Sequence, residues 1–559
     1  MLTIRICIWA AHSLPALPAA LSMRLIRFSD LLLLTLGAVL VLPVAMVLLS
    51  WLEWNVASNQ ILAAMAATVL PQYAATSVLL CLVVGLGVAL VGTATAACVT
   101  LFDFPGRRSF EWLLLLPLAM PAYVVAYAYT DFLQFSGPFQ GWIRAAFGLE
   151  GRVFPEIRSV GGAAWVFVFT LYPYVYLLTR AAFSERAAHL MEAARLLGAP
   201  LARRIRSVAL PLARPAVAAG VALALMETLA DFGVASYFGI QTFTTGIFNA
   251  WLAMDNRIAA AQLATSLLVM VALLLGLEHR AQRRLRFVAA RGGRAASAEA
   301  QPVPLRGGRL LIAWVICAGP VLMGFVLPVL FMLRPLAADW SVLPWDRFVA
   351  WAWNSVRLGG ISAALAVVFA VLLAFSLRRR SNPLTRAVAR LATLGYAVPG
   401  AVIVIGLLLP LAWLQQVAPQ SSAGFWITGT VLGVVWAYLV RFMSVALQSV
   451  QSGYARIPGS FDDTARMLGS GGLALVRRVH WPLLKRSVLV AALLVFVDVM
   501  KELPATMLLR PFNTDTLAVV AYQLARDERL GEAALPSLAL VLVGLLPVLL
   551  ISRTLRSRR

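Results

Sequence analysis

The sequence predicts an all-α polytopic membrane protein of about twelve transmembrane helices, arranged as two parallel six-helix repeats. Three observations support this fold class. Hydrophobic residues make up 61% of the 559-residue chain and charged residues only 13%, too little charge to cover the surface of a soluble protein of this size. Apolar runs of about 20 residues recur along the chain, each long enough to cross the hydrocarbon core as a helix. One polar segment also occurs twice, once in each half.

The predicted spans follow the apolar runs in order. They cover residues 28–52, 73–100, 110–130, 161–182, 215–240, 258–278, 309–334, 355–378, 388–416, 423–449, 487–510 and 534–552. Arginines gather in the segments that follow the even-numbered spans, whereas the opposite loops are poor in basic residues. Because arginine favours the cytoplasmic side, we expect an inner-membrane protein with both termini in the cytoplasm.

The net charge of +23 is therefore an orientation signal. The arginines are dispersed over the loops without aromatic platforms, which does not favour nucleic-acid binding, and the basic loops are expected to contact membrane lipid. The four cysteines and four histidines show no metal-ligand spacing, so no metal site is expected. No G-x-x-x-x-G-K-[ST] loop is possible, because neither Lys485 nor Lys501 follows a glycine. We therefore expect no enzyme activity and no cofactor bound by this chain.

The chain divides at a linker. Residues 28–278 are predicted to form the first repeat, with its polar loop at 183–214, and residues 309–552 the second, with its loop at 450–486. The linker, 279–308, is rich in Arg, Ala, Gly and Pro and is expected to be a mobile cytoplasmic strap. Residues 553–559 are a basic cytoplasmic tail. Residues 1–27 are assigned as a cytoplasmic segment whose start is compatible with a signal peptide or an over-extended gene start.

The repeated polar segment has constant spacing. The first copy runs from Glu192 through Gly198 to Pro211, and the second from Asp463 through Gly469 to Pro482. The differences 463 − 192, 469 − 198 and 482 − 211 all give 271. In each copy, a short run of helix formers ends at a glycine that suits a left-handed C-cap. A second amphipathic turn follows and is expected to stop at the proline.

Two interpretations of these segments remain open. A helix presented near the membrane face can fit a groove on a partner protein. A basic interfacial helix can instead rest on anionic lipid headgroups. The matched spacing favours the partner, because lipid binding requires no fixed spacing.

Both segments resemble the cytoplasmic EAA loop of binding-protein-dependent ABC importer permeases, whose pattern is Glu-Ala-Ala, then Gly, then Ile-x-Leu-Pro. The first copy matches well, whereas the second has Asp463-Thr-Ala465 and Trp481-Pro482 in the corresponding places. The resemblance implies the ABC type-1 permease fold and a coupling helix in each loop that docks on an ATPase subunit. The residues it assigns to ATPase coupling are Glu192, Ala193, Gly198, Asp463, Ala465 and Gly469.

The segments after each loop narrow the substrate. The runs from Ala224 to Gly233 and from Asp498 to Leu517 resemble the fused permeases of ferric-iron ABC importers, and related thiamine permeases share the layout. The resemblance covers nearly the whole chain from the second span onward. It implies ferric iron delivered by a periplasmic binding protein and two copies of a cytoplasmic ATPase that uses ATP. The alternatives are thiamine or another small cation, or a proton-driven secondary carrier using Glu227 and Glu502.

Four acids recur at the same offset inside predicted spans. Glu227 and Asp231 are four residues apart, as are Asp498 and Glu502, so each pair shares a helix face. Ionised groups at such depth are costly unless they line a wet pathway or are paired. The acids are therefore candidates for a cation pathway, with Lys501 able to neutralise the second pair. The alternative is structural: the acids pair with arginines such as Arg441, or bond helix ends.

Tyrosines offer a weaker set of pathway candidates, because phenolic oxygens are hard donors that suit ferric iron. They are Tyr123, Tyr127, Tyr172, Tyr174 and Tyr176. Aromatic packing and interface anchoring are the simpler explanation for such residues.

Overall fold

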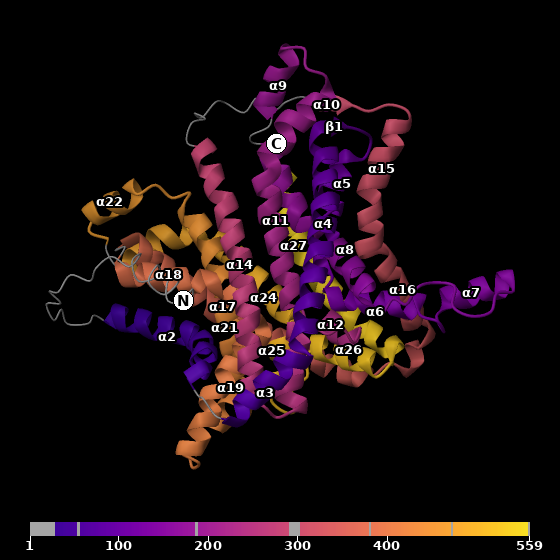
Figure 1. The fold of residues 1–559 in the computed structure, drawn as a ribbon. Helices are drawn as coiled ribbons and strands as arrows, with labels where there is room; N and C mark the ends of the chain where they lie inside the picture. The colour runs from indigo at the N-terminus through magenta and orange to yellow at the C-terminus, as the bar shows by residue number, and fades with distance from the viewer. Residues whose placement is uncertain are drawn as a thin grey trace.

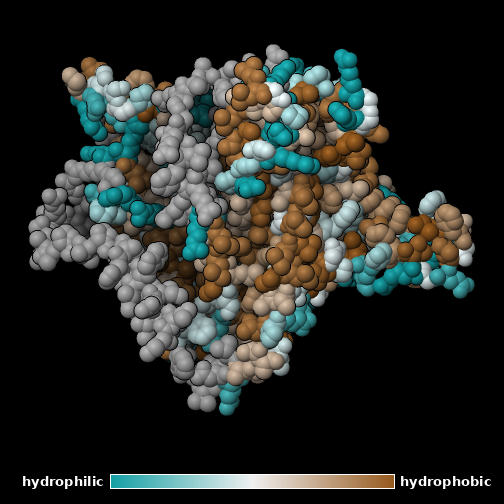
Figure 2. Space-filling model, turned by 45° about the horizontal axis from the view of Figure 1, so that its top comes forward, coloured by the Kyte–Doolittle hydropathy of each residue, from teal (hydrophilic) through white to brown (hydrophobic). Residues whose placement is uncertain are grey.

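The computed structural model describes residues 28–52, 56–184, 188–289, 302–379, 382–470 and 473–556. The described chain is a helical bundle, with one short pair of strands (Figure 1). Hydrophobic side chains cover the middle of the bundle, and hydrophilic residues gather toward the end that carries α9, α10 and α22 (Figure 2). We call this end the loop end.

The first half contains these elements: α2 (Phe28–Leu49), η1 (Ser50–Leu52), α3 (Val56–Thr68), α4 (Leu70–Leu101), β1 (Phe102–Asp103), α5 (Arg107–Leu113), η2 (Leu116–Ala119), α6 (Ala122–Leu133), α7 (Pro138–Phe147), α8 (Val160–Ala182), α9 (Ala188–Leu196), α10 (Leu201–Arg204), η4 (Ile205–Ala209), α11 (Leu210–Ala230), α12 (Gly233–Tyr237), α13 (Phe243–Phe248), η5 (Asn249–Ala253) and α14 (Arg257–Ala289). The η segments are short 3₁₀ or π turns.

The second half contains these elements: β2 (Val303–Pro304), α15 (Gly308–Val321), η6 (Leu322–Val326), α16 (Leu327–Ala338), η7 (Trp340–Val342), α17 (Trp345–Arg379), α18 (Pro383–Leu394), η8 (Gly395–Ala397), α19 (Gly400–Val417), α20 (Ala423–Thr428), α21 (Leu432–Tyr454), α22 (Ser460–Met467), α23 (Leu473–Leu475), η9 (Val476–His480), α24 (Trp481–Lys501), α25 (Pro504–Leu509), α26 (Leu517–Arg526) and α27 (Leu530–Arg556).

The membrane spans agree with the multi-pass prediction. Among the described residues, ten helices are long and apolar enough to cross a membrane, and a pair bent by 88° at residues 119–122 makes up to eleven. The predicted span at 487–510 corresponds to α24 and α25. Helix α24 is 21 residues long but carries four charged residues, Lys485, Arg486, Asp498 and Lys501, which is too many for it to count among the ten.

The first span of each half packs against the other half. Helix α2 contacts α18 and α19, whereas α15 contacts α4 and α5, and α16 contacts α6. Gly406 of α19 allows α2 to approach closely, because a Cβ atom there would collide with the Pro43 carbonyl oxygen. The two repeats are therefore interlocked and share one apolar core.

Pro211 and Pro482 do not end a helix, contrary to the expectation from sequence. The segments α10, η4 and α11 form one continuous span from Leu201 to Ala230. A π turn, Ile205–Ala209, immediately precedes α11, and η9 occupies the equivalent place, Val476–His480, before α24. The wider turn leaves room for the proline ring. It also tolerates the loss of one backbone hydrogen bond, because proline has no N–H to donate.

The predicted linker has regular secondary structure at both ends. Helix α14 continues beyond the predicted end of its span, to Ala289. Residues 290–301 lie outside the described part of the chain. Beyond them, β2 pairs in parallel with β1, with Phe102 opposite Val303, and Leu305 donates a hydrogen bond to the Asp103 carbonyl at 2.9 Å. The second half therefore begins attached to the loop after α4.

The contact between α2 and α19 generates a stability prediction. Gly406→Ala is expected to destabilise the protein by about 1–3 kcal/mol, because the added methyl group has no room against α2. Gly360→Ala is the matched control, since its Cβ would meet nothing within 4 Å and alanine favours a helix. Melting temperatures of the detergent-purified variants check this. Equal values for the two would contradict the interlocked packing.

Candidate functional site

Two regions of the structure contain the residues singled out in the sequence. One is the pair of loops at the loop end, formed by α9 and α10 in the first half and by α22 and α23 in the second (Figure 1). The other is a cavity between the halves, among helices α8, α11, α21 and α24.

Both loops end their first helix in the same way. Gly198 and Gly469 have positive φ values of 77° and 78°, which confirms the expected left-handed caps. Gly198 N donates to Arg195 O at 2.9 Å, and Ala199 N donates to Ala194 O at 3.0 Å, the paired bonds of a Schellman motif. Gly469 and Ser470 repeat these bonds to Arg466 and Ala465. Each glycine thus turns the chain sharply behind the helix tip.

The tips of these helices expose large apolar side chains. Leu196 and Leu197 are 84% and 87% exposed, and Met467 and Leu468, at the same 271 offset, are 89% and 80% exposed. Exposed apolar side chains in matched places are typical of a protein–protein contact. The sequence analysis used the spacing of the motif but did not single out these four residues.

The motif residues themselves lie around these tips. Glu192 and Asp463 form partly exposed ion pairs with the arginines three residues later, at 3.7 and 3.5 Å, and such pairs contribute little stability. Ala193 is exposed, whereas Ala465 is buried. The acids are therefore free of the bundle core and face outward from the loop end.

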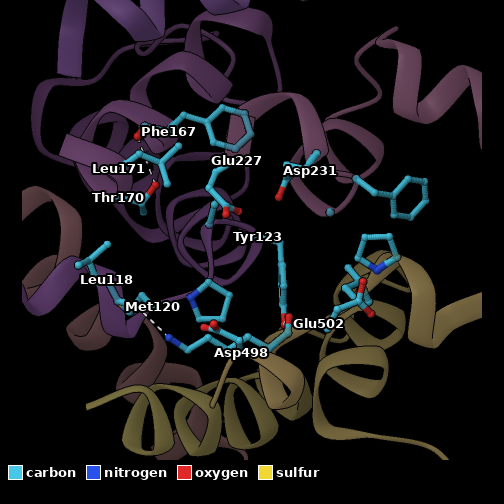
Figure 3. Close-up of a pocket in the computed structure, with 18 of the residues that line it drawn as sticks. Leu118, Met120, Tyr123, Phe167, Thr170, Leu171, Glu227, Asp231, Asp498 and Glu502 are labelled. Atoms are coloured by element: carbon cyan, nitrogen blue, oxygen red, sulfur yellow. Dashed lines mark hydrogen bonds between the residues drawn. The ribbon is translucent and has the colours of Figure 1, made fainter. Parts of the chain in front are cut away.

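The central cavity has a volume of about 180 Å³. All five cation-pathway candidates line it: Glu227, Asp231, Asp498, Lys501 and Glu502. Figure 3 shows the labelled acids around one space, with Tyr123 extending between them. The segments around η2 and η8, where two helices are interrupted, supply Met120, Pro121 and Tyr396 to the lining.

Asp231 and Glu502 each occupy the residue after a broken helix. Helix α11 ends at Ala230 and α24 at Lys501, and the following acids have nearly identical extended backbones, with φ of −72° and −71°. Asp231 Oδ1 accepts a hydrogen bond from Val234 N at 2.8 Å, and Glu502 accepts from Ala505 N and Thr506 N at 3.0 and 2.9 Å. Both acids therefore cap the short helix that follows, as the structural interpretation anticipated.

Glu502 is also paired with Arg441 of α21. The Arg441 Nη1 atom lies 3.2 Å from Glu502 Oε1, and both side chains are largely buried. Gly400 makes this approach possible, since a Cβ there would lie 2.8 Å from both atoms of the pair. Glu502 is thus fully engaged by protein groups.

Glu227 and Asp498 have a different environment. Each is partly exposed to the cavity one turn before a helix break, and neither forms an ion pair within 4 Å in the described part of the chain. The Lys501 ammonium donates to the Leu118 carbonyl at 2.9 Å rather than contacting Asp498 directly. The cavity lining therefore contains four carboxyl groups against Arg441 and Lys501, a formal excess of two negative charges.

The five tyrosine candidates lie in three different places. Tyr123 and Tyr174 line the cavity, and the Tyr123 hydroxyl lies 3.4 Å from the Lys501 carbonyl. Tyr172 and Tyr176 donate to the Leu114 and Glu111 carbonyls, at 3.0 and 3.1 Å, near the helix break after α5. Tyr127 lines a separate, smaller cavity. Packing and backbone bonding thus account for Tyr172 and Tyr176.

The carboxyl groups of the cavity are not gathered into a cluster of metal ligands. Among the described residues, no group of three or more His, Cys, Asp or Glu side chains is placed to hold a metal ion. Tyr396 was missed as a lining residue because an aromatic beside a helix break has no distinctive sequence signal. Arg441, by contrast, was identified from the sequence as a possible partner of the acids, since an arginine in the middle of an apolar segment requires a partner.

Comparison with known proteins gives two kinds of match. The family described as "Binding-protein-dependent transport system inner membrane component" matches residues 84–287 and 366–557, one segment in each half. The chain is similar to the Fe(3+)-transport system permease protein FbpB 2 of Haemophilus influenzae, at 24% identity over 85% of this chain and 88% of that protein. It is also similar to the ferric transport system permease protein FbpB of Actinobacillus pleuropneumoniae, at 23% identity over 74% of this chain and 61% of that protein.

A third relative matches less than half of this chain. The sulfate transport system permease protein CysT of Salmonella typhimurium is 29% identical over 47% of this chain and 90% of its own length. The relatives thus include both metal-ion and oxyanion permeases.

The ion-paired Glu502 and the unpaired Glu227 are expected to respond differently to mutation. Glu502→Gln is expected to cost about 3 kcal/mol, because it leaves the Arg441 guanidinium buried without a counter-charge. Glu227→Gln should change stability by less than about 1 kcal/mol, because Glu227 has no ion pair to lose. Adding Arg441→Gln to Glu502→Gln should restore part of the loss. Thermal unfolding in detergent measures all three, and equal destabilisation by the two Glu→Gln changes would contradict this assignment.

Proposed function

Because the chain belongs to the family of binding-protein-dependent transport system inner membrane components, we propose that it is the fused permease of an ATP-driven importer for ferric iron. Matches to the family in both halves support a single chain that supplies both permease units. Two relatives matched over most of this chain carry ferric or Fe(3+) transport in their names.

The acid-lined cavity is the observation that carries the cargo proposal. Its formal excess of two negative charges suits a small cation, whose desolvation inside the membrane requires compensating carboxylates. Glu227 and Asp498 supply the charge that is not already paired, and Tyr123 and Tyr174 add hard oxygen atoms. A permease must also release its cargo, so a loose arrangement of acids serves transport better than a tight chelate.

The exposed helix tips support two ATPase docking points. Leu196 and Leu197 on one loop, and Met467 and Leu468 on the other, would each enter a groove on one copy of an ATPase subunit. Two tips at one offset suit two identical partners. ATP is then bound and hydrolysed by those subunits, with no cofactor held by this chain.

The opposite end of the bundle would receive cargo from a periplasmic binding protein. This orientation places the arginine-rich loop end and both termini in the cytoplasm, in keeping with the preference of arginine for that side. The protein would then reside in the bacterial inner membrane.

A sulfate-type cargo is the second candidate, favoured by the match of 47% of the chain to a sulfate transport permease. Arg441 and Lys501 offer positive groups in the same cavity, but Arg441 is already paired with Glu502. Thiamine, also a cation, would use the same carboxylates as iron.

Uptake of radiolabelled ferric iron tests the cargo. Cells lacking this chain should regain ATP-dependent iron uptake when it is restored, and the Glu227→Gln/Asp498→Asn double variant should lower uptake per folded molecule at least about tenfold, or 1.4 kcal/mol. Asp255→Asn, which removes an acid outside this cavity, is the control. If the cells take up sulfate or thiamine instead of iron, that compound is the cargo and the iron proposal is wrong. Uptake that follows the proton gradient and ignores ATP depletion would favour a secondary carrier.

The docking proposal predicts that polar substitutions at the exposed helix tips weaken binding of the ATPase. Leu196→Ser/Leu197→Ser and Met467→Ser/Leu468→Ser should each weaken ATPase co-purification at least about tenfold, since each buried leucine or methionine contributes about 1.5–3 kcal/mol. Melting temperatures of the permease alone should not fall, because these side chains are exposed. Val417→Ser, an exposed apolar residue at the end of α19, is the control. Undiminished ATPase recovery from both double variants would contradict docking at these tips.

A further inference from the structure

The second loop is bound to the bundle through a buried charged cluster. Arg378, near the end of α17, makes a two-pronged contact with Asp462 of α22: Nε to Oδ2 at 2.7 Å and Nη2 to Oδ1 at 3.1 Å. The same guanidinium donates to the carbonyls of Tyr454, Ile457 and Pro458 at 3.0–3.2 Å, where α21 ends. Such two-pronged bonds fix orientation as well as distance.

His480 completes the cluster from the start of α24. Its Nε2 atom lies 2.9 Å from Asp462 Oδ1, and its Nδ1 atom lies 3.3 Å from the Tyr454 hydroxyl. The ring is fully buried and packs edge-on against Tyr454 and Phe375. Burial alone would raise the pKa of Asp462, but the hydrogen bonds and charges of Arg378 and His480 hold that pKa below its usual range, so the carboxylate is charged at neutral pH.

At the equivalent described positions, the first half lacks the aspartate and the histidine of this cluster. At the 271 offset, Asp462 corresponds to Met191, Tyr454 to Phe183 and His480 to Ala209, and all three counterparts are buried and apolar. Arg378 corresponds to Arg107, which instead donates to the Val99 carbonyl at 2.7 Å and lies 3.8 Å from Asp103. Apolar packing has no preferred direction, whereas the ionic contact admits one geometry. The two loops are therefore attached to the bundle by different interactions.

The cluster joins the helices that form the second half of the cavity. Helix α21 carries Arg441, and α24 carries Asp498 and Lys501, with Glu502 directly after it. Asp462 contacts the far end of each helix through Arg378 or His480, and it lies on the short helix that exposes Met467. These contacts give a direct route by which a displacement of α22 would reach both helices.

We propose that Arg378, Asp462 and His480 are positioning residues that fix the second docking helix to α17, α21 and α24, and that transport depends on this link more than on the equivalent contact of the first loop. The proposal rests on the docking role assigned above. It makes the second loop the rigid connection between ATPase movement and the cavity, with the first loop free to adjust.

The test uses the assembled transporter in proteoliposomes, with iron uptake and ATP hydrolysis measured on the same sample. Asp462→Asn and Arg378→Lys should keep the ATPase bound but lower the iron transported per ATP hydrolysed at least about fivefold. Lysine keeps the charge but cannot form the two-pronged contact. Arg379→Lys, at the exposed neighbouring position, is the matched control and should behave as the unmodified protein.

The Arg378→Lys/Asp462→Asn double variant separates a shared contact from two independent effects. If both residues act through one link, the double variant should be no worse than the worse single variant. Iron transported per ATP equal to that of Arg379→Lys, or fully additive losses, would overturn the proposal. If the unmodified protein fails to bind an ATPase, the docking role fails instead, so the two failures are distinguishable.

Discussion

The buried pair of Arg441 and Glu502 is the interaction on which the arrangement of the second half depends. Glu502 simultaneously ends α24, caps α25 and neutralises an arginine in the middle of α21. Three helical segments are thereby fixed around one carboxylate. Gly400 of α19 lies so close to the pair that a Cβ atom there would be 2.8 Å from both side chains, so the position requires glycine. The desolvation free energy of burying an arginine within the bundle is offset only if all these contacts form together.

The first half repeats the geometry without the charge pair. Asp231 caps α12 as Glu502 caps α25, but the position equivalent to Arg441 is Thr170, whose hydroxyl bonds to its own helix at Val166. Consequently the positive groups of the cavity, Arg441 and Lys501, come from the second half alone. The cavity is thus asymmetric although the backbones around it follow one repeat.

The same asymmetry appears at the loop end. The glycine caps and exposed apolar tips are alike in both loops, so both present the same shape to a partner. Behind the tips, one loop is held by apolar packing and the other by an aspartate bonded to Arg378 and His480. Fusion of two permease units into one chain allows each to specialise, because the halves are no longer constrained to be identical in sequence.

The sequence by itself determined the helical membrane fold and the two glycine caps, because hydropathy and the tolerance of glycine for the left-handed conformation act locally. It also determined the parallel repeat, because the constant offset of 271 can be counted in the sequence. It also identified five charged residues that line one cavity. Only the tertiary structure decided their roles, since Glu227 and Asp231 have the same spacing as Asp498 and Glu502 yet differ in partners. It likewise decided that Pro211 continues a helix, and that Leu196 and Met467 are exposed, because both depend on which neighbours pack against a turn rather than on the turn itself.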